Sequence, residues 1–238
     1  MLNRLRKIFH NILIICGVHN TYIKYKAKKN IAKRNKAKIF VIGFNKTGTT
    51  SVESALKEFD IYMGNQEEAE RLLENITKDD YKHLFEYCYR AEAFQDIPFS
   101  IPGVFKLLDK KFENSKFILT IRDNDNQWFN SICKFHGKLW ANGNTPKKED
   151  LANANYIYPG YPLKVINYIF GDFYYDEDHY KMIYNKHIDD VIDYFKNRPN
   201  DLLVINAAEQ ESYYKMCQFI GEIPLRETFE WKNKTNEI

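Results

Sequence analysis

A lysine and two threonines stand where the chain can bind a phosphate group. Lys46 lies inside the turn Gly43-Phe-Asn-Lys-Thr-Gly48, and Thr49 and Thr50 follow the second glycine. An ammonium group and two hydroxyls supply hydrogen-bond donors to anionic oxygens. A glycine turn that leads into a helix adds the first N–H groups of that helix, which have no acceptor within the helix. The stretch therefore predicts an anion-binding loop.

The segments on either side of this turn predict a strand and a helix. Residues 39–43 form a short apolar run, which is typical of a buried strand. After the turn, apolar residues recur at helical spacing, at Val52, Ala55, Leu56 and Phe59. The order of strand, glycine turn and helix directs the N-terminus of the helix, with its partial positive charge, toward the bound anion.

The loop differs from that of proteins that bind nucleoside triphosphates. Their motif, G-x-x-x-x-G-K-[ST], places a lysine directly after the second glycine. Here Thr49 takes that place, and the cation lies inside the loop at Lys46. The displaced lysine argues against an ATPase.

Residues 44–51, Phe-Asn-Lys-Thr-Gly-Thr-Thr-Ser, resemble the 5′-phosphosulfate loop of sulfotransferases that use 3′-phosphoadenosine 5′-phosphosulfate (PAPS). The resemblance implies that the lysine steadies the bridging oxygen as the sulfuryl group leaves. The donor-binding loop residues that it implies are Asn45, Lys46, Thr47, Gly48, Thr49 and Thr50. The alternative is a structural strand-turn-helix unit with a surface lysine.

A second stretch, residues 116–131, is similar to the 3′-phosphate motif of the same family. That motif has an arginine at the end of a strand and a serine about two helical turns later, which implies Arg122 and Ser131 here. Arginine suits such a site because its planar fork can bind two phosphate oxygens. The spacing is one residue longer than is usual, and Asn124 replaces a proline, so Asn130 competes for the serine's role. The alternative is a polar strand end followed by a helix cap.

Sulfuryl transfer also needs a base for the proton of the acceptor. Asp96 follows a predicted strand, and its Asp-Ile-Pro context is similar to one branch of the family. Other branches have a glutamate or histidine in this role, which leaves Glu67, Glu68 and His83 open. An aspartate that only caps a turn explains Asp96 equally well.

The C-terminal segment, residues 227–234, resembles the tail with which many members close over the nucleotide. The resemblance implies that Trp231 or Phe229 stacks on adenine and that Lys232 or Lys234 meets the 3′-phosphate. A hydrophobic anchor and a solvated charge run explain the same residues.

The predicted elements alternate between strands and helices. Predicted strands cover residues 89–95, 116–122 and 202–206, and predicted helices cover residues 66–75, 79–87, 102–112, 125–138, 176–197 and 211–220. This order predicts an α/β fold, a three-layer sandwich with a central parallel sheet flanked by helices. The resemblance adds that the fold is P-loop-like. Residues 141–161 predict a long loop of the kind that covers a substrate.

With 238 residues and 44% hydrophobic residues, the chain can form one globular catalytic domain. We expect it to cover residues 38–238, after a basic amphipathic segment at residues 1–37. Positions 1–52 hold twelve Lys and Arg and no Asp or Glu. The segment predicts either a helix packed on the domain or, through residues 1–38, peripheral contact with the inner membrane face. Aromatic stacking positions for nucleic acid are missing, so we expect no nucleic-acid partner.

Four dispersed cysteines, with no C-x-x-C pair, predict free thiols and a cytoplasmic location. No histidine cluster or metal-ligand spacing occurs, so we expect no metal. Together these features predict a PAPS-dependent sulfotransferase that acts on a hydroxyl acceptor, a carbohydrate or another small metabolite. The alternatives are a P-loop kinase of small molecules and a non-catalytic, membrane-associated nucleotide-binding protein.

Overall fold

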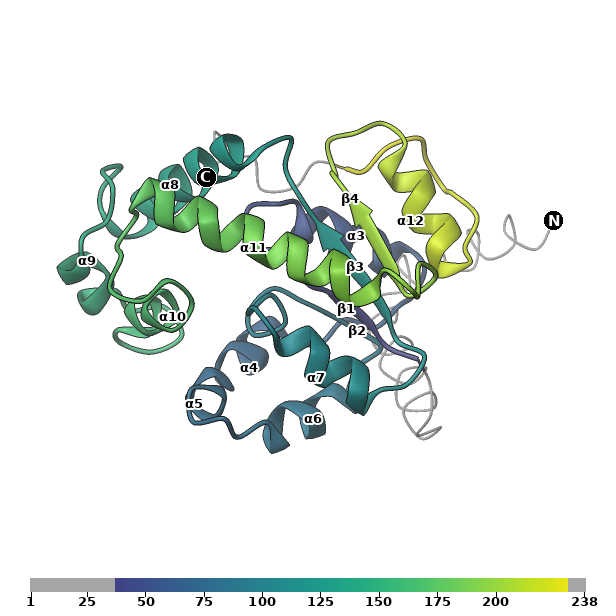
Figure 1. Cartoon of the computed structure of the whole chain (residues 1–238), viewed down its shortest axis with the longest axis horizontal. Coiled ribbons are helices and arrows are strands. Elements are labelled where there is room, and N and C mark those ends of the chain that lie inside the picture. Colours follow the sequence, from purple (N-terminus) through teal and green to yellow (C-terminus); the bar gives the residue numbers. More distant parts are fainter. Residues whose placement is uncertain (1–36, 231–238) are drawn as a thin grey trace, which may run out of the picture.

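The computed structural model describes residues 37–230, which form a parallel sheet with helices on both faces (Figure 1). Within this range the sheet has four strands in the order β2-β1-β3-β4. The strands are β1 (Ile39–Val41), β2 (Ala93–Gln95), β3 (Lys116–Thr120) and β4 (Leu202–Ile205). The predicted α/β class and the parallel sheet are confirmed. The predicted N-terminal helix and Trp231 lie outside the described residues.

The helices follow the predicted order with local differences in their bounds, except that two helices between residues 148 and 170 were not predicted. Those before β3 are α3 (Thr49–Glu58), α4 (Gln66–Glu70), α5 (Leu73–Ile76), α6 (Lys82–Cys88) and α7 (Val104–Lys111). Those after β3 are α8 (Asp125–Trp140), α9 (Lys148–Asn153), α10 (Tyr161–Phe170), α11 (Glu177–Phe195) and α12 (Ser212–Ile220). None of the helices in residues 37–230 is long and apolar enough to cross a membrane.

The structure differs most from the prediction at three places. The helix predicted for residues 66–75 is split into α4 and α5, because the amide of Leu72 bonds to the carbonyl of Ala69 in a tighter turn. Helix α7 begins after Gly103, whose φ of 84° is left-handed, and not at the preceding proline. The predicted loop at residues 141–161 contains α9, which begins where Asp150 accepts a hydrogen bond from the amide of Lys147 at 2.8 Å.

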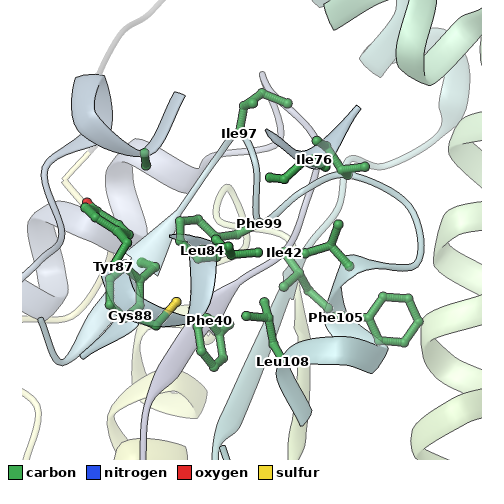
Figure 2. Close-up of a cluster of buried hydrophobic side chains, with 14 of the residues drawn as sticks. Phe40, Ile42, Ile76, Leu84, Tyr87, Cys88, Ile97, Phe99, Phe105 and Leu108 are labelled. Atoms are coloured by element: carbon green, nitrogen blue, oxygen red, sulfur yellow. The ribbon is translucent and has the colours of Figure 1, made fainter. Parts of the chain in front are cut away.

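Alternating strand residues send their side chains into two hydrophobic cores, one on each face of the sheet. On one face, Phe40 stacks against Phe94 and Phe117 of the neighbouring strands, with ring centroids 5.6 and 5.4 Å apart. Figure 2 shows Leu84 of α6 and Leu108 of α7 in this core. On the other face, apolar residues of α3 and α12 pack against the sheet. The two cores hold the sheet between layers of helices.

A third apolar cluster lies beyond the carboxyl ends of the strands. It joins Phe44 to side chains of α8, α9, α10 and α11. Trp128 of α8 is fully buried there and stacks on Tyr184 of α11, with ring centroids 4.3 Å apart. In Figure 1, α8, α9 and α10 gather at one end of the molecule, away from α12. This cluster gives the loop after β1 a rigid support.

The strand order places a topological switch point between β1 and β3. From β1 the chain crosses to β2 on one side, whereas β3 pairs with the other side of β1. Ligands of open α/β sheets bind in the crevice that forms at the carboxyl ends of such strands. The glycine turn follows β1 and Arg122 follows β3, so both predicted anion-binding groups lie at the switch point.

Candidate functional site

Both glycines of the predicted loop are needed for its close packing. A Cβ atom on Gly43 would lie 2.1 Å from Oγ1 of Thr120, at the end of β3. Gly48 has a φ of 103°, and a Cβ atom there would lie 2.7 Å from that of Ala207, which follows β4. The loop therefore fits between β3 and the segment after β4 only with glycine at these positions.

Three side chains from distant parts of the sequence hold the carbonyl groups of the segment after β1. Nε1 of Trp128 donates to the carbonyl of Asn45 at 3.1 Å, and Nε of Arg122 donates to that of Lys46 at 2.7 Å. Nε2 of His187 donates to the carbonyl of Ile42 at 2.9 Å. Burial lowers the pKa of His187, which keeps its imidazole neutral. The loop conformation is therefore fixed before any ligand binds.

Thr47 has a structural position within the loop. Its hydroxyl donates to the carbonyl of Phe44 at 2.5 Å and therefore accepts from the hydroxyl of Thr120, 2.6 Å away. The residue is 1% exposed. The structure thus places its side chain in the interior, whereas the resemblance implied a place among the donor-binding residues.

The N-terminus of α3 is open to an anion. Gly48 is the cap residue, no side chain caps the helix, and its first turn contains no acidic residue. The first-turn amides and the helix dipole therefore favour a negative group at this end. Thr49 and Thr50 add their hydroxyls, since both residues line the adjoining pocket.

A pocket of about 350 Å³ lies at the carboxyl ends of the strands. It brings together Lys46 after β1, Asp96 after β2 and Arg122 after β3. Seven of the predicted site residues line it: Asn45, Lys46, Gly48, Thr49, Thr50, Asp96 and Arg122. Residues from three separate stretches of sequence therefore share one site.

The predicted partner of Arg122 is not among the residues that line the pocket. Ser131 is half-buried in the second turn of α8, and Asn130 beside it is exposed. The choice between them for the 3′-phosphate stays a prediction.

The charge of Arg122 affects the pKa of Lys46 inside the pocket. Burial, and then the charge of Arg122, lower the pKa of Lys46 to about 8, while the charge of Asp96 acts in the opposite direction. The ammonium group lies 4.2 Å from the centroid of the Phe135 ring, which favours the charged form. Lys46 is thus mostly protonated at neutral pH, yet only weakly solvated, which suits a group that meets an anion.

Asp96 has the properties of a general base. Burial raises the pKa of its carboxyl group to about 6, although the amide of Ile97 donates to Oδ1 at 2.8 Å and favours ionisation. The nearby charge of Glu53 raises the pKa further, and that of Lys46 lowers it. A carboxylate with a pKa of about 6 is mostly ionised at neutral pH and still accepts a proton readily.

The three alternative bases lie outside the pocket. Glu67 and Glu68 are exposed and form ion pairs with Arg71 and Arg90, at 2.7 and 3.5 Å. The side chain of His83 is 53% exposed and lies near Asp80. Asp96 is therefore the one of the four predicted bases that faces the site.

A family model described as a sulfotransferase domain matches residues 38–238. The chain belongs to this sulfotransferase family. A search of curated proteins found no match. The match covers the strands, the loop and the pocket described above, so the sulfotransferase fold accounts for nearly all of the described chain.

His136 and Glu70 of the sulfotransferase also line the pocket, and neither was predicted as a site residue. His136 of α8 is buried, and its Nδ1 atom lies 2.8 Å from the hydroxyl of Tyr175. Burial and the charge of Lys46 lower its pKa to about 3, so the imidazole is neutral and a weaker base than Asp96. Glu70, the last residue of α4, is 5% exposed.

The sequence contains a partial signal for Glu70 and none for His136. Glu70 follows Gln66 by four residues, a spacing that places both on one face of a helix. Which face of that helix turns toward the pocket depends on its packing against the rest of the chain. No sequence signal distinguishes His136 from a core histidine.

The described part of the sulfotransferase holds its cysteines as free thiols. Cys88, Cys133 and Cys217 form no disulfide. Burial raises the pKa of Cys133 and of Cys217 to about 11, so neither is a thiolate at neutral pH. Across residues 37–230, no three His, Cys, Asp or Glu side chains gather in a way that could hold a metal ion.

Proposed function

We propose that this sulfotransferase transfers a sulfuryl group from PAPS to the hydroxyl group of a small acceptor. The observation that carries the proposal is that Lys46 and Arg122 line the same pocket. The Nε atom of Arg122 lies 2.7 Å from the carbonyl oxygen of Lys46, and both side chains line the same cavity. A donor with anionic groups at its 5′ and 3′ positions fits two cations that follow the adjacent strands β1 and β3.

The loop and the start of α3 suit the 5′-phosphosulfate end of the donor. The uncapped amides at Gly48 and Thr49 bind anionic oxygens, and the hydroxyl of Thr50 adds a donor. Lys46 then stabilises the negative charge that develops on the phosphate as the sulfur–oxygen bond breaks. Asn45, which also lines the pocket, completes this end of the proposed site.

Arg122 suits the 3′-phosphate. Its guanidinium group keeps its charge throughout the working pH range, although burial lowers its pKa. We assign Ser131 to the same phosphate. Stacking of Trp231 on adenine completes the proposed nucleotide site, and that residue lies outside the described part of the chain.

Asp96 is the proposed base for the acceptor. Its carboxylate takes the proton of the acceptor hydroxyl as the acceptor oxygen forms its bond to sulfur. The bond between sulfur and the phosphate oxygen breaks in the same step, and Lys46 neutralises the charge that this oxygen gains. The sulfated acceptor and adenosine 3′,5′-bisphosphate are the products.

Thermal stabilisation by two nucleotides tests the donor. A ligand at about one hundred times its dissociation constant stabilises the folded protein by about 2.7 kcal/mol. For a domain of this size that corresponds to a rise of roughly 5–10 °C in Tm. We expect this rise with adenosine 3′,5′-bisphosphate and a smaller one with ATP and magnesium. An equal or larger effect of ATP and magnesium would favour the kinase alternative.

Transfer of labelled sulfate from PAPS to a panel of hydroxyl compounds tests the reaction itself. We expect a labelled product that depends on Lys46 and on the acceptor. Binding of the bisphosphate without transfer to any acceptor would favour a non-catalytic nucleotide-binding protein.

A further inference from the structure

Outside the phosphate loop, much of the lining of the pocket is apolar. This apolar wall is formed by the C-terminal part of α8, by α10 and by the segment that leads into α10. Its apolar and aromatic lining residues include Leu139, Trp140, Tyr156, Val165, Ile169 and Phe170. Such a surface binds apolar or aromatic groups, because burying them removes apolar area from water. A carbohydrate would leave many of its hydroxyl groups without partners against this wall.

Glu70 supplies a carboxylate at this apolar end. Its Oε1 atom accepts a hydrogen bond from Nε2 of Gln66 at 3.0 Å, and the same amide group donates to the carbonyl of Ile97 at 2.9 Å. The Oε2 atom is buried and has no hydrogen-bond partner among the described residues. A buried carboxylate oxygen without a donor is costly, so the geometry fits a ligand that brings a donor.

The groups around Glu70 leave it an ionisable carboxyl group that can carry a negative charge. The hydroxyl of Tyr161 is close enough to lower the pKa of Glu70, but it forms no hydrogen bond of good geometry. Burial and the charges of Asp96 and Glu67 raise this pKa to about 7, and Tyr156 is a further close neighbour. Glu70 is thus an ionisable acceptor of hydrogen bonds on a wall that is otherwise apolar.

The charges of the pocket are divided between its two ends. Asp96 interacts electrostatically with both Lys46 and Glu70, so it lies near both the loop and the apolar end. Among the described residues that line the pocket, Lys46 and Arg122 are the basic side chains apart from the neutral His136. Both belong to the phosphate end. An anionic acceptor would therefore meet two carboxylates, whereas a cationic one would be attracted.

We propose that Glu70 recognises the acceptor, and that this acceptor is a hydroxyl compound with an apolar or aromatic body and a protonated amine. The amine donates to the Oε2 atom of Glu70, the body lies against the apolar wall, and the hydroxyl faces Asp96. This inference rests on the sulfuryl transfer proposed above, because it assigns the second substrate of the same pocket.

Three phenols that share an arylethyl core test the inference. Tyramine ends in an ammonium group, para-ethylphenol ends in a methyl group and para-hydroxyphenylpropanoate ends in a carboxylate. Their affinities are measured by calorimetry in the presence of saturating adenosine 3′,5′-bisphosphate, which gives a binding readout without turnover. The titrations are made at about pH 8, where Glu70 is mostly ionised and the amine is protonated.

We expect wild-type protein to bind tyramine about 10- to 100-fold more tightly than para-ethylphenol, and the carboxylate least tightly. Glu70→Gln should abolish the preference for tyramine over para-ethylphenol. Glu68→Gln is the matched control, since it removes an exposed carboxylate of the same helix that pairs with Arg90 outside the pocket. This control should keep the preference.

A second measurement on wild-type protein covers the case in which Glu70→Gln does not fold. The preference for tyramine should decline as the pH falls through about 7, because Glu70 then gains a proton and loses its charge. Equal affinities, a preference for the carboxylate, or a preference that survives Glu70→Gln would overturn the inference. The inference would also be overturned if the protein bound the bisphosphate but none of the three phenols. If the bisphosphate itself fails to bind, the proposed function fails, and the inference fails with it.

Discussion

Replacement of Arg122 by alanine should weaken binding of the 3′-phosphate far more than binding of the 5′-phosphate. The arginine contributes a charge at the switch point and a hydrogen bond of 2.7 Å to the carbonyl of Lys46. A hydrogen bond between charged groups is worth about 1.5–3 kcal/mol, and each 1.4 kcal/mol changes affinity tenfold. The variant should therefore bind adenosine 3′,5′-bisphosphate about 10- to 150-fold more weakly.

Adenosine 5′-monophosphate is the matched ligand, because it lacks the 3′-phosphate. Its affinity should depend on Arg122 only through the hydrogen bond that holds the loop. That bond is donated by a charged group, but it holds the loop and does not touch the ligand, so we expect only part of its contribution to reach the affinity, a loss of roughly 2- to 10-fold. The difference between the two ligands isolates the contact with the 3′-phosphate.

Calorimetric titration of both nucleotides into wild-type protein, Arg122→Ala and Arg71→Ala measures this difference. Arg71 is a suitable control, since it forms an exposed ion pair with Glu67 at 2.7 Å outside the pocket. Arg71→Ala should leave both affinities unchanged. The assignment would be refuted if Arg122→Ala weakened both nucleotides equally, or if it left the affinity for the bisphosphate intact.

Further predictions concern the rate, its pH dependence and the stability of the loop. Lys46→Ala should lower kcat by about 10²- to 10³-fold, measured by labelled-sulfate transfer, and unchanged turnover would remove its role. Asp96→Asn should reduce the rate about 10²-fold or more with little effect on bisphosphate affinity, and full activity would move the base elsewhere. The pH profile of kcat/KM should rise through about pH 6 as Asp96 ionises and fall above about pH 8 as Lys46 loses its proton, whereas a flat profile would contradict both assignments. Gly48→Ala should lower the free energy of unfolding by about 1–3 kcal/mol in denaturant titrations, because of its φ of 103° and the contact with Ala207, and wild-type stability would show that the loop can relax.

The parts of the site that follow a strand directly could be predicted from the sequence. The loop at residues 43–48 has a glycine at each end and lies between an apolar run and a helical pattern. Arg122 and Asp96 each end a predicted strand, and parallel strands bring their carboxyl ends to one edge. The resemblance to the sulfotransferase family singled out these residues, and the general rule of sheet topology then predicted that they share one edge of the sheet.

The parts that depend on how helices dock could not be predicted in this way. Helix α4 carries three glutamates, and only its packing against the rest of the chain decides that Glu70 faces inward while Glu67 and Glu68 face solvent. The support of the loop by Trp128 likewise depends on a contact across 83 residues of sequence. Periodicity indicates that a helix has an apolar face, but it does not say which polar neighbour of that face enters a pocket.

The segment before α10 could be predicted only in part. Its Asn, Gly, Pro and Tyr content predicted a loop over the substrate, and Tyr156 of this segment does line the pocket. The short helix α9 within it was missed because six residues carry too little periodic pattern to be recognised.

A crystal structure of the sulfotransferase with adenosine 3′,5′-bisphosphate tests the central claim most directly. We predict the 5′-phosphate at the start of α3, within hydrogen-bond distance of Lys46 and Thr49, and the 3′-phosphate at Arg122. A nucleotide bound elsewhere, or in this pocket with Arg122 away from its 3′-phosphate, would contradict the proposed site.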